Sequence, residues 1–316
     1  MSETKIDFHD FHWLDISNPT PEVLEQMAKT YDLHPTSVQD CLQPEHLPKH
    51  EIIYDISFMV LRAYDKDCHQ AADTVQELTR KVAVFYSEKF VITVHRQDLP
   101  FIATLIDKWG KRAKSDMGVT PEHILGDLLI EVVKTYDQPV LDCMANLEQF
   151  EMEIFGAGTQ RKFRIQNGYY LKRKVSVFKR MLRATLDPLG RVMSEGEADL
   201  QPHFQNAKDM INDIYFYADE ISESLASLLN LHISLASQKT NEASRRTNEV
   251  MRVLTIFSCF FLPINFIASI YGMNFEFMPE TKWEYGYYFS LGLMLTVVVS
   301  IFMWFRKKGW LKSRPA

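Results

Sequence analysis

Four polar side chains interrupt an otherwise apolar stretch near the C-terminal end of the sequence, and they recur at spacings of 3, 7 and 4 residues. These residues are Thr255, Ser258, Asn265 and Ser269. Steps that average about 3.5 residues place side chains in one narrow row along a helix that packs in a parallel bundle. Met251 and Leu262 continue the row at the same period, and Asn248 extends it toward the N-terminus.

Hydroxyl and amide groups of this kind can hold a hydrated ion through its waters and release it again. The row contains no Asp, Glu, Lys or Arg, although a site for a bare cation would normally use carboxylates. Mg²⁺ gives up its water reluctantly and usually keeps several water ligands. Uncharged oxygens along the row therefore suit a divalent cation that passes with its water.

An amide in the middle of a membrane costs free energy unless it is paired or hydrated, so Asn265 needs a partner. One interpretation is structural: the row joins neighbouring helices through hydrogen bonds. The other is functional: the row lines a pore, which requires several copies of the chain around one axis because two helices cannot enclose a channel. Met251, Leu262 and the neighbouring Leu254 would then be apolar constrictions that close the pore by dewetting.

The row leads to Gly272, Met273 and Asn274, after which the sequence becomes acidic. We expect Gly272 to end the helix with a positive φ angle, and Met273 to pack and hold the turn. Asn274 would offer an amide oxygen to an incoming hydrated cation. Glu276 and Glu280 follow, and their charges would raise the local cation concentration at the entrance.

Two stretches, residues 253–275 and 285–305, contain no charged residue. Each is close to the roughly 20 apolar residues that a helix needs to cross about 30 Å of hydrocarbon. Basic residues precede the first stretch, and Arg306, Lys307 and Lys308 begin the tail, residues 306–316, after the second. Because basic flanks stay in the cytoplasm, both termini are predicted to be cytoplasmic, with residues 276–284 as a short external loop.

The elements that position these spans precede them. Residues 1–118 are predicted to form a mixed α and β domain, with one strand over 51–64 and a hairpin around 87–89. Residues 119–200 are predicted to form a hairpin of an acidic and then a basic helix, with Pro139 kinking the first helix and a turn at 187–190. Residues 201–252 are predicted to be the cytosolic part of a stalk helix that continues into the first span.

Residues 161–183 form a basic run with three open interpretations: a solvated face, a surface for lipid head groups, or the partner of the acidic helix. The net charge of −6 argues against a general nucleic-acid binder. The four cysteines show no paired metal-ligand spacing. The sequence has no phosphate loop and no GxSxG or HExxH motif, so neither an enzyme nor a cofactor is expected.

The segment YGMNFEFMPE is preceded by TNEVMRVLTIFSCFFLPINFIASI and followed by a second span that ends in FRKKGWLKSR. This sequence resembles the CorA family of divalent cation transporters, whose signature is the Gly-Met-Asn tripeptide. The resemblance is strong over residues 240–312 and looser before them. It implies an α+β membrane protein with an N-terminal cytosolic α/β/α domain, a long stalk helix and two C-terminal transmembrane helices. It also implies a homopentamer with a funnel-shaped cytosolic part.

The family resemblance further implies Mg²⁺ influx, often with Co²⁺ or Ni²⁺ also permeating, across the plasma (inner) membrane. The expected partners are other copies of the chain, the lipid bilayer and the divalent cation itself. Gly272, Met273 and Asn274 would carry the selectivity for hydrated cations. The positions that match the family's pore lining and gate are Asn248, Met251, Leu254 and Leu262, and its basic ring matches Arg306, Lys307 and Lys308.

Members of this family often close when intracellular Mg²⁺ binds acidic residues between neighbouring cytosolic domains. Asn206 and Asn230 stand here where acids are often found. Asp209 and Asp213 remain nearby, and Asp55 is a candidate partner on the α/β domain. The resemblance therefore implies a regulatory Mg²⁺ site that is moved or weaker.

Two alternatives stay open. A ZntB-like transporter of the same fold would carry Zn²⁺, although its signature usually differs after the glycine. A membrane-anchored structural or sensor protein would use the long helix for assembly alone.

Overall fold

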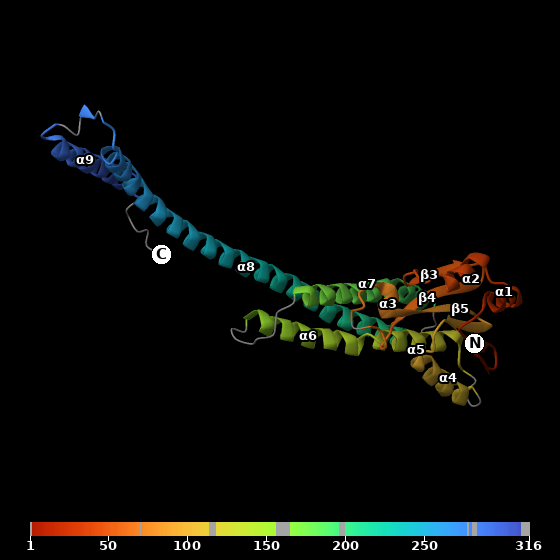
Figure 1. The fold of residues 1–316 in the computed structure, drawn as a ribbon. Helices are drawn as coiled ribbons and strands as arrows, with labels where there is room; N and C mark the ends of the chain where they lie inside the picture. Colours follow the sequence, from red (N-terminus) through yellow and green to blue (C-terminus); the bar gives the residue numbers. More distant parts are fainter. Residues whose placement is uncertain are drawn as a thin grey trace. The chain divides into compact units, whose positions relative to one another are not determined.

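The computed structural model of the chain describes residues 2–69, 71–113, 118–155, 165–195, 200–276, 278–279 and 283–310. The chain divides into two compact units, Met1–His232 and Ile233–Ala316, and each is described by itself. One helix, α8 (Gln201–Tyr271), belongs to both units (Figure 1).

The first unit is built on a six-stranded sheet with the order β1-β2-β6-β5-β4-β3. Only the β2–β6 pair is parallel among the pairs of this sheet, and the others are antiparallel. The strands are β1 (Ser2–Asp7), β2 (His12–Ser17), β3 (Lys49–Ile53), β4 (Ile56–Tyr64), β5 (Thr79–Ser87) and β6 (Phe90–His95).

Helices cover both faces of this sheet, because its central strands are apolar on both sides. Phe58 and Val60 of β4 pack with α1 (Pro21–Thr30) and α2 (Pro35–Leu42), whereas Met59 and Leu61 belong to the core on the other face. Figure 1 shows the sheet between these two layers. The helices that contribute to the second core are α3 (Val75–Leu78), α4 (Pro100–Arg112), α5 (Pro121–Lys134), α6 (Asp137–Phe155), α7 (Ile165–Glu195) and the start of α8. The predicted α/β/α arrangement is therefore confirmed.

The strand predictions are confirmed at one hairpin and wrong at another. β5 and β6 pair in antiparallel register with Ser87 opposite Phe90, as predicted. Residues 51–64, however, form two strands and not one, because the chain turns at Tyr54 and Asp55. Tyr54 has a φ angle of 56°, a conformation that non-glycine residues adopt rarely. The alternation of apolar residues continues through this turn, so periodicity alone did not reveal it.

The helical predictions also need two corrections. The helix that begins at Pro121 breaks at Thr135 and Tyr136, so Pro139 lies in the first turn of a new helix, α6, where a proline is tolerated. The turn predicted at residues 187–190 is wrong, because α7 continues through Pro188 to Glu195. Leu189 is fully buried in the core. Its burial outweighs the cost of a proline inside the helix.

The basic residues of α7 do not pair with the acidic residues of α6 among the described residues. Arg173 instead binds Asp73 at 2.7 Å, and Lys179 binds Asp219 of α8. Lys174 lies 5.5 Å from the centre of the Tyr64 ring. The complementary-charge interpretation of this helical hairpin is therefore wrong for the part of the run that the structure describes, which excludes 156–164.

Apolar contact holds α6 against α7, and Gly168 makes it possible. A Cβ atom added to Gly168 would lie 2.5 and 2.8 Å from ring carbons of Phe150, which is buried. Another glycine of α7, Gly190, has no neighbour within 4 Å of an added Cβ. A side chain at position 168 would therefore clash with Phe150, whereas one at position 190 would meet open space.

We predict that Gly168→Ala lowers the stability of the full chain by about 1–3 kcal/mol, the usual cost of overpacking a core. Gly190→Ala is the matched control, and it should raise stability by up to about 1 kcal/mol because alanine favours a helix. Thermal unfolding of both variants in detergent, followed by circular dichroism, measures the difference. Equal shifts in the same direction would contradict this account of the α6–α7 contact.

Candidate functional site

The second unit contains the C-terminal part of α8 and the helix α9 (Gly286–Lys307), and both are long and apolar enough to cross a membrane. One face of α9 packs against α8 (Figure 1). Gly286, Ser290 and Phe305 on this face are buried. The rings of Phe260 and Phe305 lie 5.9 Å apart. The small residues at the start of α9 permit close approach of the two backbones.

The face of α8 that packs on α9 is marked by its half-buried residues, whereas its other positions between 250 and 270 are exposed. The half-buried positions are Arg252, Ile256, Cys259, Phe260, Pro263, Ile264, Ile267 and, at the end of the helix, Tyr271. Their spacing of three and four residues defines one side of the helix.

The polar row lies on the other side. A helix turns by about 100° per residue, which places the centre of the row about 150° around α8 from the centre of the packed face. Every member of the predicted pore lining is exposed: Asn248, Met251, Leu254, Thr255, Ser258, Leu262, Asn265 and Ser269. The structure therefore brings these residues together on one open face, as the spacing predicts.

The side chains of the row do not join α8 to α9. Thr255 donates a hydrogen bond to the carbonyl oxygen of Met251, 2.7 Å away in its own helix. Ser258, Asn265 and Ser269 have no hydrogen-bonding partner for their side chains within the described parts of the chain. If the row acts as a polar contact between helices, its partner is another copy of the chain or another molecule.

The segment after the row differs from the prediction at Gly272. The N–H group of Gly272 binds the carbonyl oxygen of Ala268 at 3.0 Å, so the last turn of α8 remains regular. Gly272 does not have a positive φ angle, and a Cβ added to it would make only ordinary contacts of 3.4 and 3.5 Å. Met273 is 51% exposed, so its side chain is not buried in the turn. The expected left-handed glycine is wrong, and packing of Met273 on the turn stays a prediction.

Asn274 and Glu276 are exposed beyond the end of α8. Glu280 lies outside the described residues. Among the described residues, no contact requires a glycine at 272 or an amide at 274, and the side chain of Met273 is not buried.

The glycine that does adopt a positive φ angle among the described glycines is Gly309, with φ of 75°. It follows the end of α9, where Trp310 donates its N–H to the carbonyl of Phe305 and Gly309 donates to that of Arg306, at 3.1 and 3.2 Å. These two hydrogen bonds form a Schellman motif. The rings of Phe305 and Trp310, on either side of it, have their centres 5.6 Å apart. This cap was not predicted from the sequence, although a basic last turn followed by glycine is the usual signal.

The three basic residues predicted to form a ring, Arg306, Lys307 and Lys308, are exposed in and after the last turn of α9. Positive charge is favourable there because the carbonyl end of a helix carries partial negative charge.

The three acids predicted for cation regulation are not assembled in one chain. Asp55 lies in the turn between β3 and β4, and Asp209 and Asp213 are exposed on α8. Asp209 accepts a hydrogen bond from Gln205 at 2.8 Å. Across the described residues, no three or more His, Cys, Asp or Glu side chains lie close enough to hold a metal ion.

Comparison with known proteins supports these assignments of elements. The family model for the CorA-like Mg²⁺ transporter protein matches residues 8–307. The cobalt/magnesium transport protein CorA of Thermotoga maritima is 28% identical over 310 residues, which cover 95% of this chain and 83% of the relative.

Two solved structures show the same fold. The CorA magnesium transporter from Methanocaldococcus jannaschii has a TM-score of 0.64 at 19% identity, over 98% of this chain and 95% of that one. The ZntB cytoplasmic domain from Vibrio parahaemolyticus has a TM-score of 0.58 at 11% identity, over 73% and 90%. The N-terminal α/β domain, the long helix and the C-terminal apolar helices are thereby confirmed as one known architecture.

The two glycines at the helix ends give a stability test. Gly309→Ala should destabilise the chain by about 1–2 kcal/mol, because an L-residue is strained in the left-handed region. Gly272→Ala should change the unfolding temperature little, since neither its φ angle nor its surroundings exclude a methyl group. Thermal unfolding of both variants in detergent provides the comparison. A larger loss at Gly272 than at Gly309 would show that the fold itself requires Gly272.

Proposed function

This chain belongs to the family of CorA-like Mg²⁺ transporter proteins and is a divalent cation transporter, and from that membership we propose that it carries Mg²⁺ into the cytoplasm. Co²⁺ is proposed as further cargo, in keeping with the name of the Thermotoga relative, and Ni²⁺ is proposed from the family resemblance alone. The observation that carries the proposal is the exposed polar row of α8, which faces away from α9 and leads to Gly272, Met273 and Asn274.

We propose that the row becomes the wall of a central pore when five copies of the chain assemble. In one chain, α9 covers a single face of α8 and leaves the row exposed. A row of amide and hydroxyl groups facing lipid would be costly, since lipid offers neither water nor a hydrogen-bonding partner. A shared axis removes this cost for every copy at once, because all rows then face water.

The uncharged wall suits a cation that keeps its water. Between residues 253 and 275 there is no charged side chain, so no carboxylate holds the ion tightly. Ser258, Asn265 and Ser269 would accept hydrogen bonds from the waters of the ion, and such contacts are weak enough to permit release. Met251 and Leu262, both largely exposed in one chain, would form the apolar constrictions.

The entrance is proposed at the loop after α8. Asn274 would bind the waters of an arriving cation, and Glu276 would attract it electrostatically. Gly272 is not needed for the backbone of one chain. We infer that it is needed where the copies converge, because a methyl group on each copy would narrow the mouth.

The proposed setting is the plasma (inner) membrane, with both termini in the cytoplasm. Arg306, Lys307 and Lys308 at the end of α9 would lie at the anionic cytoplasmic leaflet. A membrane potential of 100 mV, negative inside, favours entry of a divalent cation by about 4.6 kcal/mol. No catalytic step is proposed.

Regulation by intracellular Mg²⁺ is proposed to need a neighbouring copy. Asp55, Asp209 and Asp213 do not form a cluster with each other in the described chain, but all three are exposed and available to another subunit. Because positions 206 and 230 carry amides and not carboxylates, we expect this site to bind Mg²⁺ weakly.

A Zn²⁺ transporter of the same fold remains the second proposal. The observation that favours it is the likeness of the first unit to the ZntB domain. The observation against it is the polar row, since Zn²⁺ prefers nitrogen and sulfur ligands and the row offers oxygens. Competition of Mg²⁺ and Zn²⁺ for uptake by reconstituted protein separates the two.

We predict that Asn274→Ala abolishes most Mg²⁺ uptake into proteoliposomes while the assembled protein keeps its size in chromatography. The amide is exposed and forms no hydrogen bond with the described residues, so its loss should affect the ion and not the fold. Asn146→Ala, the same change at an exposed position of α6, is the control and should leave uptake unchanged. Undiminished uptake in Asn274→Ala would remove the selectivity role from this residue.

Neighbouring positions on α8 provide a test of the pore wall. Ser258 is exposed on the row, whereas Cys259 is half buried on the face that packs on α9. The test compares the double variant Ser258→Cys, Cys259→Ser with the parent chain, which keeps Ser258 and Cys259. We predict that a water-soluble cationic thiosulfonate inhibits Mg²⁺ uptake by the double variant and does not inhibit uptake by the parent chain. Cys68 should be replaced by serine in both proteins, because it is the other incompletely buried cysteine. Equal inhibition of the two proteins, or of neither, would place the row outside a water-filled path.

A further inference from the structure

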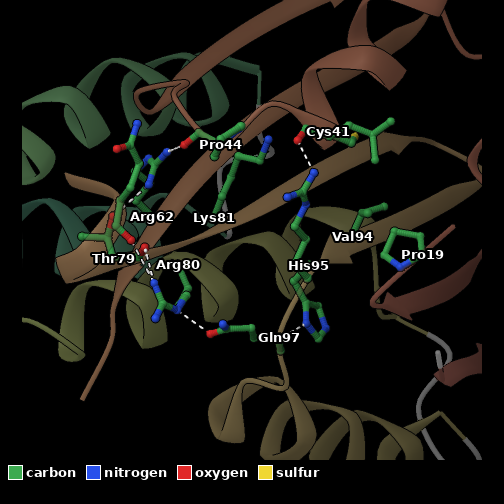
Figure 2. A pocket seen from close by; sticks show the side chains of 13 residues that line it. Pro19, Cys41, Pro44, Arg62, Thr79, Arg80, Lys81, Val94, His95 and Gln97 are labelled. Carbon is green, nitrogen blue, oxygen red and sulfur yellow. Dashed lines mark hydrogen bonds between the residues drawn. The ribbon is translucent and has the colours of Figure 1, made fainter. Parts of the chain in front are cut away.

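A small cavity of about 160 Å³ lies in the first unit, between the segment that follows α2 and the strands β4, β5 and β6 (Figure 2). Five of the residues that line it are basic. The basic residues are Arg62, Arg80, Lys81, His95 and Arg96. Figure 2 shows Arg62, Arg80 and Lys81 on one side of the view and His95 on the other.

Two of these basic groups have carboxylate partners. His95 lies 3.3 Å from Asp15, and Arg80 forms an ion pair with Asp65. Their charges are therefore compensated within the domain.

The other three cations bind only uncharged oxygens among the described residues. Arg62 donates to the carbonyl of His46 at 2.7 Å, to Thr79 Oγ1 at 2.9 Å and to the carbonyl of Pro44. Lys81 donates to the carbonyls of Asp40 and Gln43, and Arg96 to that of Leu42. The nearby carboxylate of Asp40 pairs with Lys49 at 2.6 Å and with His46 at 3.0 Å, and Lys49 also pairs with Glu51 at 2.9 Å.

These carbonyls belong to the end of α2 and the residues after it, so the cations have a structural role. A helix C-terminus carries about half an elementary negative charge, which is much less than the three positive charges that surround it. Unused donors also remain: an arginine has five N–H groups and a lysine three, and Arg96 uses one in the bonds given above. Capping of α2 therefore accounts for only part of this cluster.

The excess charge is costly because the site is partly enclosed. Arg62 is only 2% exposed, and a buried charge without a counter-charge is strongly disfavoured. Burial, with the nearby charges of Arg62 and Arg96, lowers the pKa of Lys81 to about 8. The cluster would be relieved by an anion in the cavity that these residues line.

We propose that this cavity is a binding site for a phosphate group. A phosphate carries up to two negative charges, and its oxygens match the planar N–H pairs of arginine better than a single-atom anion does. Cavities for drug-sized ligands are typically about 300–1,000 Å³, so the volume suits a phosphate with some water but not a whole nucleotide. The ligand is free phosphate or the phosphoryl end of a larger molecule that remains outside.

Bound phosphate would tie three strands to the segment after α2 through shared contacts. It would therefore stabilise the folded domain by mass action. The site is independent of the cation path, because all its residues belong to the first unit. A phosphate measurement can consequently fail or succeed without any change in the proposed transport function.

The experiment is isothermal titration calorimetry of the full chain in detergent with inorganic phosphate, at constant ionic strength set by sodium chloride. A nucleoside triphosphate in EDTA is titrated separately to distinguish a free phosphate from the end of a larger molecule. The variants are Arg96→Gln, which changes an exposed side chain, and Lys81→Gln. Lys89→Gln is the matched control, since Lys89 is exposed in the turn between β5 and β6 and lies outside the cavity lining.

We expect saturable phosphate binding that weakens about tenfold or more in Arg96→Gln and Lys81→Gln, the loss typical of one charge-assisted hydrogen bond, and stays unchanged in Lys89→Gln. Tighter binding of the triphosphate through the same residues would support the site and identify a larger ligand. Circular dichroism establishes whether each variant is folded. If Lys81→Gln is not folded, the result for Arg96→Gln decides the test. Absence of binding at millimolar phosphate, or equal weakening in Lys89→Gln, would overturn the proposal.

Discussion

The structure of the second unit depends on one constraint: a hydrogen-bonding side chain in a membrane must meet water or a partner. α8 carries Asn265 and several hydroxyl groups through its apolar stretch, and α9 covers only the opposite face. A two-helix unit cannot satisfy this constraint by itself. In the proposed assembly, further copies of the chain meet this need, and the side that they share is the side that carries the polar row.

The first unit pairs most of its buried polar groups within one chain; His50 Nδ1 and Trp109 Nε1 are buried without a hydrogen-bond partner among the described residues. Its sheet is apolar on both faces and is covered by helices on each, so burial is nearly complete without a partner. The exception is electrostatic. Arg62, Lys81 and Arg96 hold the segment after α2 by donating to carbonyl groups, and this arrangement leaves positive charge uncompensated beside a cavity. The positions proposed to act are thus the polar row of the second unit and the basic cluster of the first.

The sequence predicts most of the elements because their hydrophobic patterns are strong. The hairpin around Ser87, the long helix α8 and the two apolar stretches all follow from periodicity or length. The errors occur where tertiary packing outweighs local preference. Burial of Leu189 carries α7 through Pro188, and the turn at Tyr54 is invisible because apolar residues alternate on both sides of it. The residues of the polar row were predicted to share one face because the helical repeat alone determines that face. The φ angle of Gly272 depends instead on how the helix ends. The cavity around Lys81 could not be predicted, because its residues come from strands and loops distant in sequence.

The middle of α8 has a further consequence. Every residue from 233 to 250 is exposed, and the helix passes through this region without a break. Loss of one residue there would turn all later side chains by about 100° relative to the preceding ones. Loss of seven would turn them by only about 20°. A change of about 7, 11 or 18 residues therefore nearly preserves the rotation of one end of the helix relative to the other, whereas most other changes do not. The two TNE segments, seven residues apart, have the form of one such increment.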